Sequence, residues 1–254
     1  MAGIHKNEVE KARQSFSRIM NHPKYSEILR DDKHLELLLK MTDAEINGNI
    51  LDVGTGSGYL AFPLAEAHPH HKVVGIDITP NIIEKNNRKA AEEELKNVEF
   101  ISFDGIHYPF ESQSFGLIIT RYAFHHFPDI REIAKQFSTM LNEQGRILIS
   151  DPVRHERDAN HVIDQFMRVK GDGHIQFYTP EEIARIFSEY GIVVETNQWT
   201  SMKFPFPQRQ EYLDLFASLS DAEREMYDLY QKDETIWVGK IDVTNILLRK
   251  GSLE

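Results

Sequence analysis

Residues 49–60 read Asn-Ile-Leu-Asp-Val-Gly-Thr-Gly-Ser-Gly-Tyr-Leu, an apolar run that ends in Asp52 and is followed by glycine at positions 54, 56 and 58. This pattern predicts a buried strand that turns sharply into a helix. Glycine suits such a turn because it adopts backbone angles that a Cβ forbids and lets a ligand approach the main chain. The helix N-terminus also offers unpaired N–H groups to a polar ligand. The segment therefore predicts a ligand site; the alternative is a tight connection that binds nothing.

The spacing of the glycines separates two kinds of nucleotide site. The dinucleotide fingerprint is Gly-x-Gly-x-x-Gly, whereas here the third glycine comes one residue early and Tyr59 occupies the expected position. The sequence Asp-x-Gly-x-Gly-x-Gly resembles motif I of the class I methyltransferases that use S-adenosylmethionine (SAM) as the methyl donor. The resemblance implies SAM as cofactor and S-adenosylhomocysteine as its product. In this segment the implied cofactor residues are Asp52, Gly54, Thr55, Gly56, Gly58 and Tyr59.

Composition limits the class of protein. The 254 residues suffice for one large α/β domain or two small ones. The chain has no cysteine, which excludes disulfides, thiolate metal sites and a cysteine nucleophile. Its net charge is −11 and it has no run of Lys or Arg, so nucleic-acid binding is not expected. No apolar stretch reaches the roughly 18 to 20 residues of a membrane span, and the first residues lack a signal-peptide pattern. A cytoplasmic location without a membrane span is expected.

Strand and helix patterns alternate from residue 50 onward, which predicts a Rossmann-like, mainly parallel sheet of seven strands with helices on both faces. The predicted strands are 50–53, 72–77, 98–102, 115–120, 146–150, 192–199 and 243–249. The predicted helices between them are 59–67, 80–95, 130–141, 159–169 and 180–190. Two capping boxes, at Thr179 with Glu182 and at Ser220 with Glu223, mark further helix starts.

One domain is expected over residues 1–254. Helical spacing at 9–20 and 33–41 predicts an N-terminal helical lid within residues 1–47. Residues 48–151 form the predicted SAM-binding core, and 152–250 form the substrate-side half. Within that half, 203–231 is expected to be a helical insertion before the last strand, opened by a rigid Pro-rich turn or extended segment at 203–207.

Acidic residues follow the second and third predicted strands. In open parallel sheets, ligands bind outside the carboxyl ends of the strands, and a ribose-binding acid lies about 20 residues beyond the glycine turn. Asp77, followed by Ile78, stands at that place, where a carboxylate can accept hydrogen bonds from two ribose hydroxyls. The alternative for Asp77 is an exposed acid favoured by the dipole of the next helix.

Asp104 and Gly105 follow the third strand. With Pro109-Phe110 they resemble the Asp-Ala/Gly-x-x-x-Pro-Phe segment of SAM methyltransferases, in which the Asp holds the adenine amino group. The alternative is an Asx turn closed by Pro-Phe.

The stretch from residue 49 to 151 is similar to the small-molecule methyltransferases of ubiquinone and menaquinone biosynthesis. Besides the segments above, Arg121-Tyr-Ala-Phe-His-His-Phe127 and Leu141-Asn-Glu-Gln-Gly-Arg146 carry the resemblance, and Phe115-Gly116 departs from it where the family has Phe-Asp. It implies direct transfer of the SAM methyl group, with Arg121 and Tyr122 near the methionine end of the cofactor.

Two histidines, His125 and His126, follow the fourth strand and are the candidate general bases, because imidazole titrates near neutral pH. The alternative is that both pack against the next helix. No metal site is expected: the later histidines, with Asp151 and Asp158, match no ligand spacing.

Aromatic residues outside the core are the candidate substrate contacts. An aromatic ring of the lid, Tyr25 or Phe16, could face the sulfonium through a cation–π contact. Phe204, Phe206 and Tyr212 of the insertion suggest a partly apolar acceptor; the alternative is packing against the sheet edge.

The expected acceptor atom is a carbon or oxygen of a small molecule. No Asn-Pro-Pro-Tyr or Asp-Pro-Pro-Tyr follows the fourth strand, which argues against methylation of amino groups on DNA bases or glutamine. The chain can be a monomer or a homodimer. Two other functions remain open on the sequence: a SAM-binding regulatory protein without catalysis, and an NAD(P)-dependent oxidoreductase.

Overall fold

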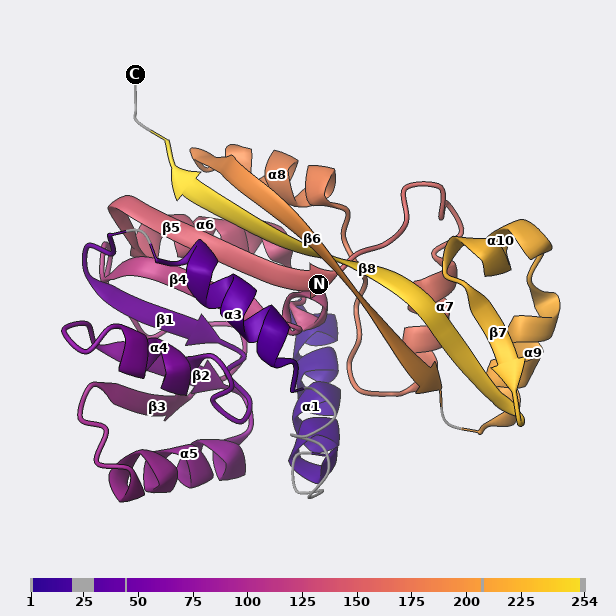
Figure 1. Cartoon of the computed structure of the whole chain (residues 1–254), viewed down its shortest axis with the longest axis horizontal. Helices are drawn as coiled ribbons and strands as arrows, with labels where there is room; N and C mark the ends of the chain where they lie inside the picture. Colours follow the sequence, from indigo (N-terminus) through magenta and orange to yellow (C-terminus); the bar gives the residue numbers. More distant parts are fainter. Residues whose placement is uncertain (1, 20–29, 44, 207, 252–254) are drawn as a thin grey trace.

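The computed structural model describes residues 2–19, 30–43, 45–206 and 208–251. Within this part of the chain, eight strands form one sheet in the order β3-β2-β1-β4-β5-β8-β6, with β7 paired to β8 (Figure 1). Pairing is parallel from β3 to β5 and antiparallel around β8. The strands are β1 (Asn49–Val53), β2 (Val73–Asp77), β3 (Val98–Ser102), β4 (Phe115–Arg121), β5 (Leu141–Pro152), β6 (Ile192–Phe206), β7 (Leu229–Lys232) and β8 (Thr235–Lys250). The predicted mainly parallel α/β fold is confirmed, with one strand more than the seven predicted.

Helices cover both faces of the sheet. On one face, side chains of β1, β2 and β4 pack against α3 (Asp32–Met41), α4 (Ala61–Ala67) and α5 (Pro80–Glu92). On the other face, the alternate side chains of the same strands pack against α6 (Ile130–Met140) and α8 (Pro180–Ser188). Because neighbouring residues of a strand point to opposite faces, a strand buried on both sides is mostly apolar, as residues 115–119 of β4 are.

The helices start where local chemistry predicts. Asp129 caps α6, since its carboxylate accepts hydrogen bonds from the N–H groups of Arg131 and Glu132. Both predicted capping boxes are formed, at the start of α8 and of α10 (Asp221–Met226). Thr79 stands at the N-cap of α5 but its hydroxyl makes no capping hydrogen bond. Instead, the Thr79 N–H donates to Asp77.

A distal lobe is built beyond the sheet's edge by α7 (Val162–Val169), α9 (Gln210–Ser218), α10, β7 and the far halves of β6 and β8 (Figure 1). One sequence prediction is wrong here: β8 begins at Thr235, eight positions before the predicted residue 243. Residues 203–206 continue β6 and are therefore extended, which is one of the two predicted forms. Strands β6 and β8 pair with each other over almost their whole length. Alternation of apolar and polar residues, read over a few residues at a time, does not reveal such long strands. The strand β7 was not predicted.

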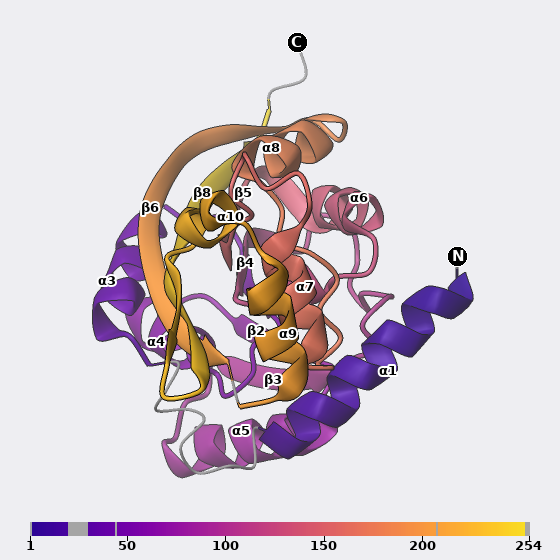
Figure 2. The ribbon, with the colours of Figure 1, turned by 90° about the vertical axis from the view of Figure 1, so that its right-hand side faces the viewer.

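Two smaller predictions also change. Strand β5 starts at Leu141 and not at the predicted residue 146, and the added part is irregular, because its register with β4 shifts there. Helix α1 (Ala2–Ile19) starts earlier than the predicted residue 9. Figure 2 shows α1 crossing the lower right of the molecule, where one of its ends overlaps α5 in this view.

Candidate functional site

A cleft opens at the carboxyl ends of the core strands, beneath α1. Its walls come from the glycine turn after β1, the segments after β2, β3 and β4, and one side of α1. The lining residues are Val9, Ala12, Phe16, Asp52, Gly54, Thr55, Gly56, Ser57, Tyr59, Leu60, Asp77, Ile78, Ile82, Lys85, Phe103, Gly105, Arg121, Tyr122, Ala123, His126, Phe127 and Pro128. Most of the predicted cofactor residues are therefore brought together; Gly58 and Asp104 do not line the cleft.

The backbone of the turn after β1 requires glycine at three positions. Gly54, Gly56 and Gly58 all have positive φ, at +72°, +50° and +76°. A Cβ on Gly54 would lie 2.6 Å from the Cβ of Ala123, so the turns after β1 and β4 can approach only without a side chain there. A Cβ on Gly58 would instead meet the ring of Phe62. Gly54 thus shapes the cleft, whereas Gly58 serves the packing behind it.

Asp77 ties the glycine turn to β2. Its Oδ2 accepts a hydrogen bond from the Gly56 N–H at 3.0 Å, and its Oδ1 accepts one from the Thr79 N–H at 2.9 Å. The residue is only 6% exposed, and burial raises the pKa of its carboxyl. Each carboxylate oxygen has a further lone pair, so Asp77 can still accept hydrogen bonds from a diol in the cleft.

Asp52 is the second buried carboxyl of the cleft. The Thr55 hydroxyl donates to its Oδ2 at 2.7 Å. Burial, together with the negative charge of Asp77, raises the pKa of Asp52 to about 7. A cationic ligand group beside Asp52 would stabilise its ionised form. The ammonium group of a bound amino acid has the required charge.

Arg121 lies between two tyrosine rings at the edge of the cleft. Its guanidinium carbon is 4.2 Å from the centre of the Tyr59 ring and 4.0 Å from that of Tyr122. The Tyr59 hydroxyl donates to the carbonyl of Asp31, which caps α3. Tyr122 has a positive φ of 54°, which turns its ring back toward α3.

His34, a residue that was not predicted, supports Tyr122 from α3. His34 is buried, and its Nε2 lies 2.8 Å from Asn245 Oδ1, an acceptor. Its Nε2 therefore carries the hydrogen, which leaves Nδ1 to accept from the Tyr122 hydroxyl at 3.3 Å. Burial lowers the pKa of His34, in agreement with a neutral ring. One signal was available: His34 shares the apolar stripe of its helix with Leu38 and Met41.

The two candidate bases have different places. His126 lines the cleft, with its ring edge-on to Phe16 at a centroid distance of 5.0 Å. His125 does not; its Nδ1 lies 2.9 Å from Asp151 Oδ2, and both side chains are buried. Burial lowers the pKa of His125 and raises that of Asp151, so this pair is neutral overall wherever the shared proton resides. Burial also lowers the pKa of His126.

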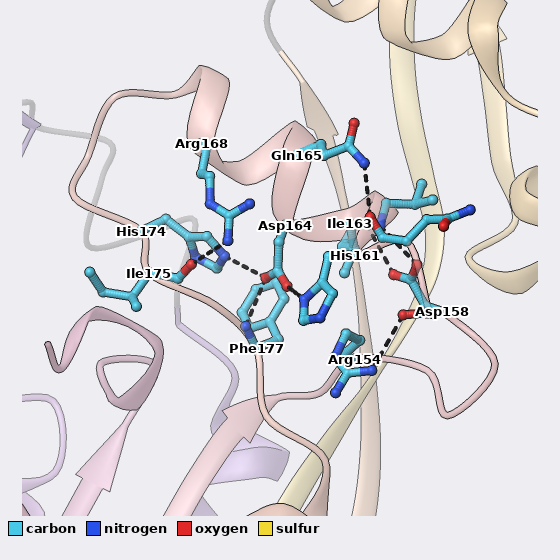
Figure 3. A network of polar contacts seen from close by, with 12 residues as sticks. Arg154, Asp158, His161, Ile163, Asp164, Gln165, Arg168, His174, Ile175 and Phe177 are labelled. Atoms are coloured by element: carbon cyan, nitrogen blue, oxygen red, sulfur yellow. Dashed lines mark hydrogen bonds and ion pairs between the residues drawn. The ribbon is translucent and has the colours of Figure 1, made fainter. Parts of the chain in front are cut away.

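A network of buried polar side chains supports the histidines from the segment after β5. In Figure 3, Asp164 lies between His174 and His161: its Oδ1 is 2.7 Å from His174 Nε2 and its Oδ2 is 2.8 Å from His161 Nδ1. The Phe177 N–H also donates to Asp164. The His174 ring packs against His125 at 5.2 Å. His161 and His174 are thus paired with a carboxylate, and no group of three or more potential metal ligands occurs among the described residues.

Asp104 and Gly105 take separate roles. Asp104 Oδ1 accepts from the N–H groups of Ile106 and His107, and its Oδ2 lies 2.7 Å from His107 Nδ1. This is the Asx-turn arrangement, and adenine recognition by Asp104 stays a prediction. Gly105 lines the cleft with φ +83°, and a Cβ there would lie 2.8 Å from Val9 of α1.

The predicted substrate residues of the insertion lie away from the cleft, whereas Phe16 of the predicted lid lines it. Phe206 and Tyr212, each 1% exposed, stack at 4.7 Å inside the distal lobe, and Phe204 packs beside them. Tyr25 lies outside the described residues. The apolar side chains that do line the cleft come from α1, from Leu60, Ile78, Ile82 and Phe103, and from Ala123 and Phe127.

Comparison with known proteins shows the family of the chain. Residues 45–203 match the family model described as Methyltransferase domain. An uncharacterized methyltransferase of Bacillus subtilis, YcgJ, is 30% identical over 65% of this chain and 67% of its own. The demethylmenaquinone methyltransferase of Thermotoga maritima is 27% identical over 63% of this chain and 75% of its own.

Solved structures show the same fold. The crystal structure of YcgJ has a TM-score of 0.75 at 21% identity, with 87% of this chain and all 100% of that chain covered. A putative methyltransferase from Bacillus halodurans has a TM-score of 0.77 at 21% identity over the same shares. The fold and the cleft define a class I SAM-dependent methyltransferase acting on small molecules. The chain belongs to the methyltransferase domain family, which rules against an NAD(P)-dependent oxidoreductase. In the described residues, none of the helices combines the length and apolarity that a membrane crossing requires.

Proposed function

We propose that this methyltransferase transfers the methyl group of SAM to a carbon or oxygen of a partly apolar small molecule, with His126 as the general base. The observation that carries the proposal is the division of the cleft into two sides. At one side, Asp77 is bonded to the glycine turn; at the other, His126 faces Phe16 among apolar residues of α1.

The polar side fits the cofactor. The bare Gly54 lets the turns after β1 and β4 meet at the cleft, and Thr55 and Gly56 offer main-chain positions for the cofactor's carboxylate. Asp52 suits the ammonium group because its pKa of about 7 falls when a cation binds beside it. Asp77 has free lone pairs for the ribose hydroxyls. The apolar Ile78 and Ile82, with Phe103, line the adjoining part of the cleft and suit a flat base.

The chemistry requires little covalent help. SAM supplies a methyl group already activated by its sulfonium, so the chain has to hold the acceptor in line and keep water out. Val9, Ala12 and Phe16 of α1 supply an apolar cover over this part of the cleft. An acceptor that is apolar at its reacting end would gain from burial against these side chains.

His126 is better placed than His125 to take the acceptor's proton. It borders the cleft, whereas His125 is bonded to Asp151 behind it. Because its pKa is lowered, the His126 ring is neutral at pH 7 and has a nitrogen lone pair. The buried Asp172 lies near this ring and favours the imidazolium that proton transfer produces.

Named relatives offer two kinds of acceptor. The chain is 26% identical to the demethylmenaquinone methyltransferase of Porphyromonas gingivalis over 79% of both chains. It is 34% identical to the nocamycin O-methyltransferase of Saccharothrix syringae, although over only 46% of this chain and 42% of that one. These names support testing quinone precursors and molecules with a free hydroxyl group as acceptors.

Calorimetry and a methylation assay test the proposal. We expect SAM and S-adenosylhomocysteine to bind with a one-to-one stoichiometry and NAD not to bind. A panel of quinone-like and hydroxylated aromatic acceptors should then yield products heavier by one methylene, detected by mass spectrometry together with S-adenosylhomocysteine. SAM binding without turnover of any apolar acceptor, but with turnover of polar ones, would refute the apolar acceptor class.

A further inference from the structure

We propose that this protein forms a two-fold symmetric dimer in which the outer edge of β6 pairs antiparallel with β6 of a second copy, centred on Trp199. The proposal concerns a surface remote from the cleft and does not depend on the acceptor. Within the described residues, β6 pairs only with β8, so its other edge is the end of the sheet. Figure 2 shows β6 as the outermost curve of the sheet, on the left of the view.

The middle of this edge lacks the protection that edge strands usually have. Natural edge strands avoid pairing with other copies through charges, prolines or bulges. Residues 196–202 read Thr-Asn-Gln-Trp-Thr-Ser-Met and contain no charge and no proline. Trp199 is 56% exposed, and Val193 and Val194 of the same strand are 39% and 43% exposed. A Trp that exposes this much apolar surface on a bare sheet edge is typical of an interface.

The main-chain groups of the middle residues have the required direction. Asn245 of β8 donates from its side-chain amide to the carbonyl of Gln198, so that carbonyl points toward β8. Main-chain groups alternate in direction along a strand. The N–H and C=O groups of Asn197, Trp199 and Ser201 therefore point to the outer edge. In an antiparallel pair centred on Trp199, Trp199 of one protomer lies opposite Trp199 of the second, and Asn197 of one lies opposite Ser201 of the other.

The ends of the stretch are complementary in charge. A two-fold axis at Trp199 brings Glu195 of one copy beside Lys203 of the other, and the symmetry repeats the pair at the opposite end. The register of β6 with β8 shifts at these same two places, between Val194 and Thr196 and between Met202 and Phe204. The irregularities thus bound the regular segment symmetrically. Glu195 also pairs with Arg146, but it keeps about a third of its side chain exposed.

Analytical ultracentrifugation of the full chain tests the dimer. We expect the wild-type protein to sediment as a dimer at micromolar concentration and Trp199→Lys to sediment as a monomer, because two ammonium groups would meet at the axis. Tyr230→Lys is the matched control: Tyr230 is 40% exposed but lies on β7 of the distal lobe. Circular dichroism and SAM binding verify that each variant is folded.

Charge exchange supplies a test that does not depend on Trp199. Glu195→Lys and Lys203→Glu should each raise the dimer dissociation constant by roughly tenfold, since like charges then face each other across the strands. The double variant restores opposite charges at both ends and should recover the wild-type constant. A wild-type monomer at all concentrations overturns the proposal. So does a dimer that Trp199→Lys leaves intact, or one that the double variant fails to restore.

Discussion

The two sides of the cleft are built in different ways. The polar side comes from a short run of sequence, residues 52–77, and buried hydrogen bonds hold its members to one another, as between Asp77 and Gly56. The apolar side comes from α1, which precedes the sheet in sequence; among its described side chains only Ala12 and Ser15 are buried. On the proposed assignment of the two sides, donor recognition is part of the core of the fold, whereas acceptor recognition depends on a peripheral helix. Changes on the polar side should therefore affect SAM binding, and changes on the apolar side should affect the acceptor.

The largest effect is expected at the meeting point of the two sides. His126→Gln should lower kcat by roughly 100- to 10,000-fold, the usual contribution of a general base, and leave SAM affinity unchanged. Turnover measured by mass spectrometry and binding measured by calorimetry separate the two quantities. Changing His125 to Gln is the neighbouring control, expected to act through stability because His125 is buried against Asp151. Equal turnover in His126→Gln and the wild type would assign His126 to packing.

A side chain at Gly54 should damage the polar side directly. Gly54→Ala places a Cβ 2.6 Å from Ala123 at a φ of +72°. Overpacking alone costs roughly 1–3 kcal/mol, and strain at positive φ adds to it. Gly191→Ala is a matched control, since Gly191 has φ +73° but open space around it. We expect SAM binding to weaken strongly in the first variant only; equal losses in both would show that backbone strain, and not the cleft, accounts for the effect.

Removal of the Asp77 carboxylate should weaken SAM binding by roughly 1–3 kcal/mol, the cost of leaving buried donors unpaired. Asp77→Ala deprives the Gly56 and Thr79 N–H groups of their acceptor as well as any ribose hydroxyl. Asp77→Asn keeps one carbonyl acceptor, so its SAM affinity should lie between those of Asp77→Ala and the wild type. Calorimetry with SAM measures the order of the three proteins, and an affinity of Asp77→Ala equal to wild type would contradict the ribose role.

A change on the apolar side of the cleft should alter acceptor binding and leave SAM binding unchanged. Phe16→Ala removes the ring that packs edge-on against His126 and should reduce acceptor binding by roughly 1–2 kcal/mol through lost apolar burial. Its effect appears in the acceptor KM, whereas SAM affinity stays within about twofold. A variant with weakened SAM binding and an unchanged acceptor KM would reverse the assignment of the two sides.

The smallest effect concerns pH. In the protein without a bound ligand, Asp52 has a pKa of about 7, and a bound ammonium group would favour its ionised form. Below pH 7, binding must first remove the proton, so SAM affinity should fall by up to about tenfold per pH unit as pH decreases, and level off above pH 7. Calorimetry between pH 6 and 7.5 measures this slope. Asp52→Asn should abolish it; a wild-type affinity constant across this range would show that Asp52 meets no cation.

Sequence patterns located the polar side well because its determinants are local. Asp77 and the three glycines follow strands whose apolar runs are readable in short windows, and parallel strands bring their carboxyl ends together. Asp104 satisfied the same rule but turned its carboxylate to His107, since nearby N–H groups compete for an acceptor. The role of His34 could not be predicted because its partners, Tyr122 and Asn245, are far away in the sequence.

The sequence by itself determined the α/β fold, the class of cofactor and the order of the polar residues along the chain. These depend on apolar periodicity, on glycines that positive φ demands, and on acids at strand ends. Tertiary structure alone decided which histidine faces the cleft, which aromatic residues cover it, and that Phe204, Phe206 and Tyr212 pack within the distal lobe. The reason is physical: an aromatic or imidazole ring is equally suited to a core or a site, and only the contacts made across the fold distinguish the two.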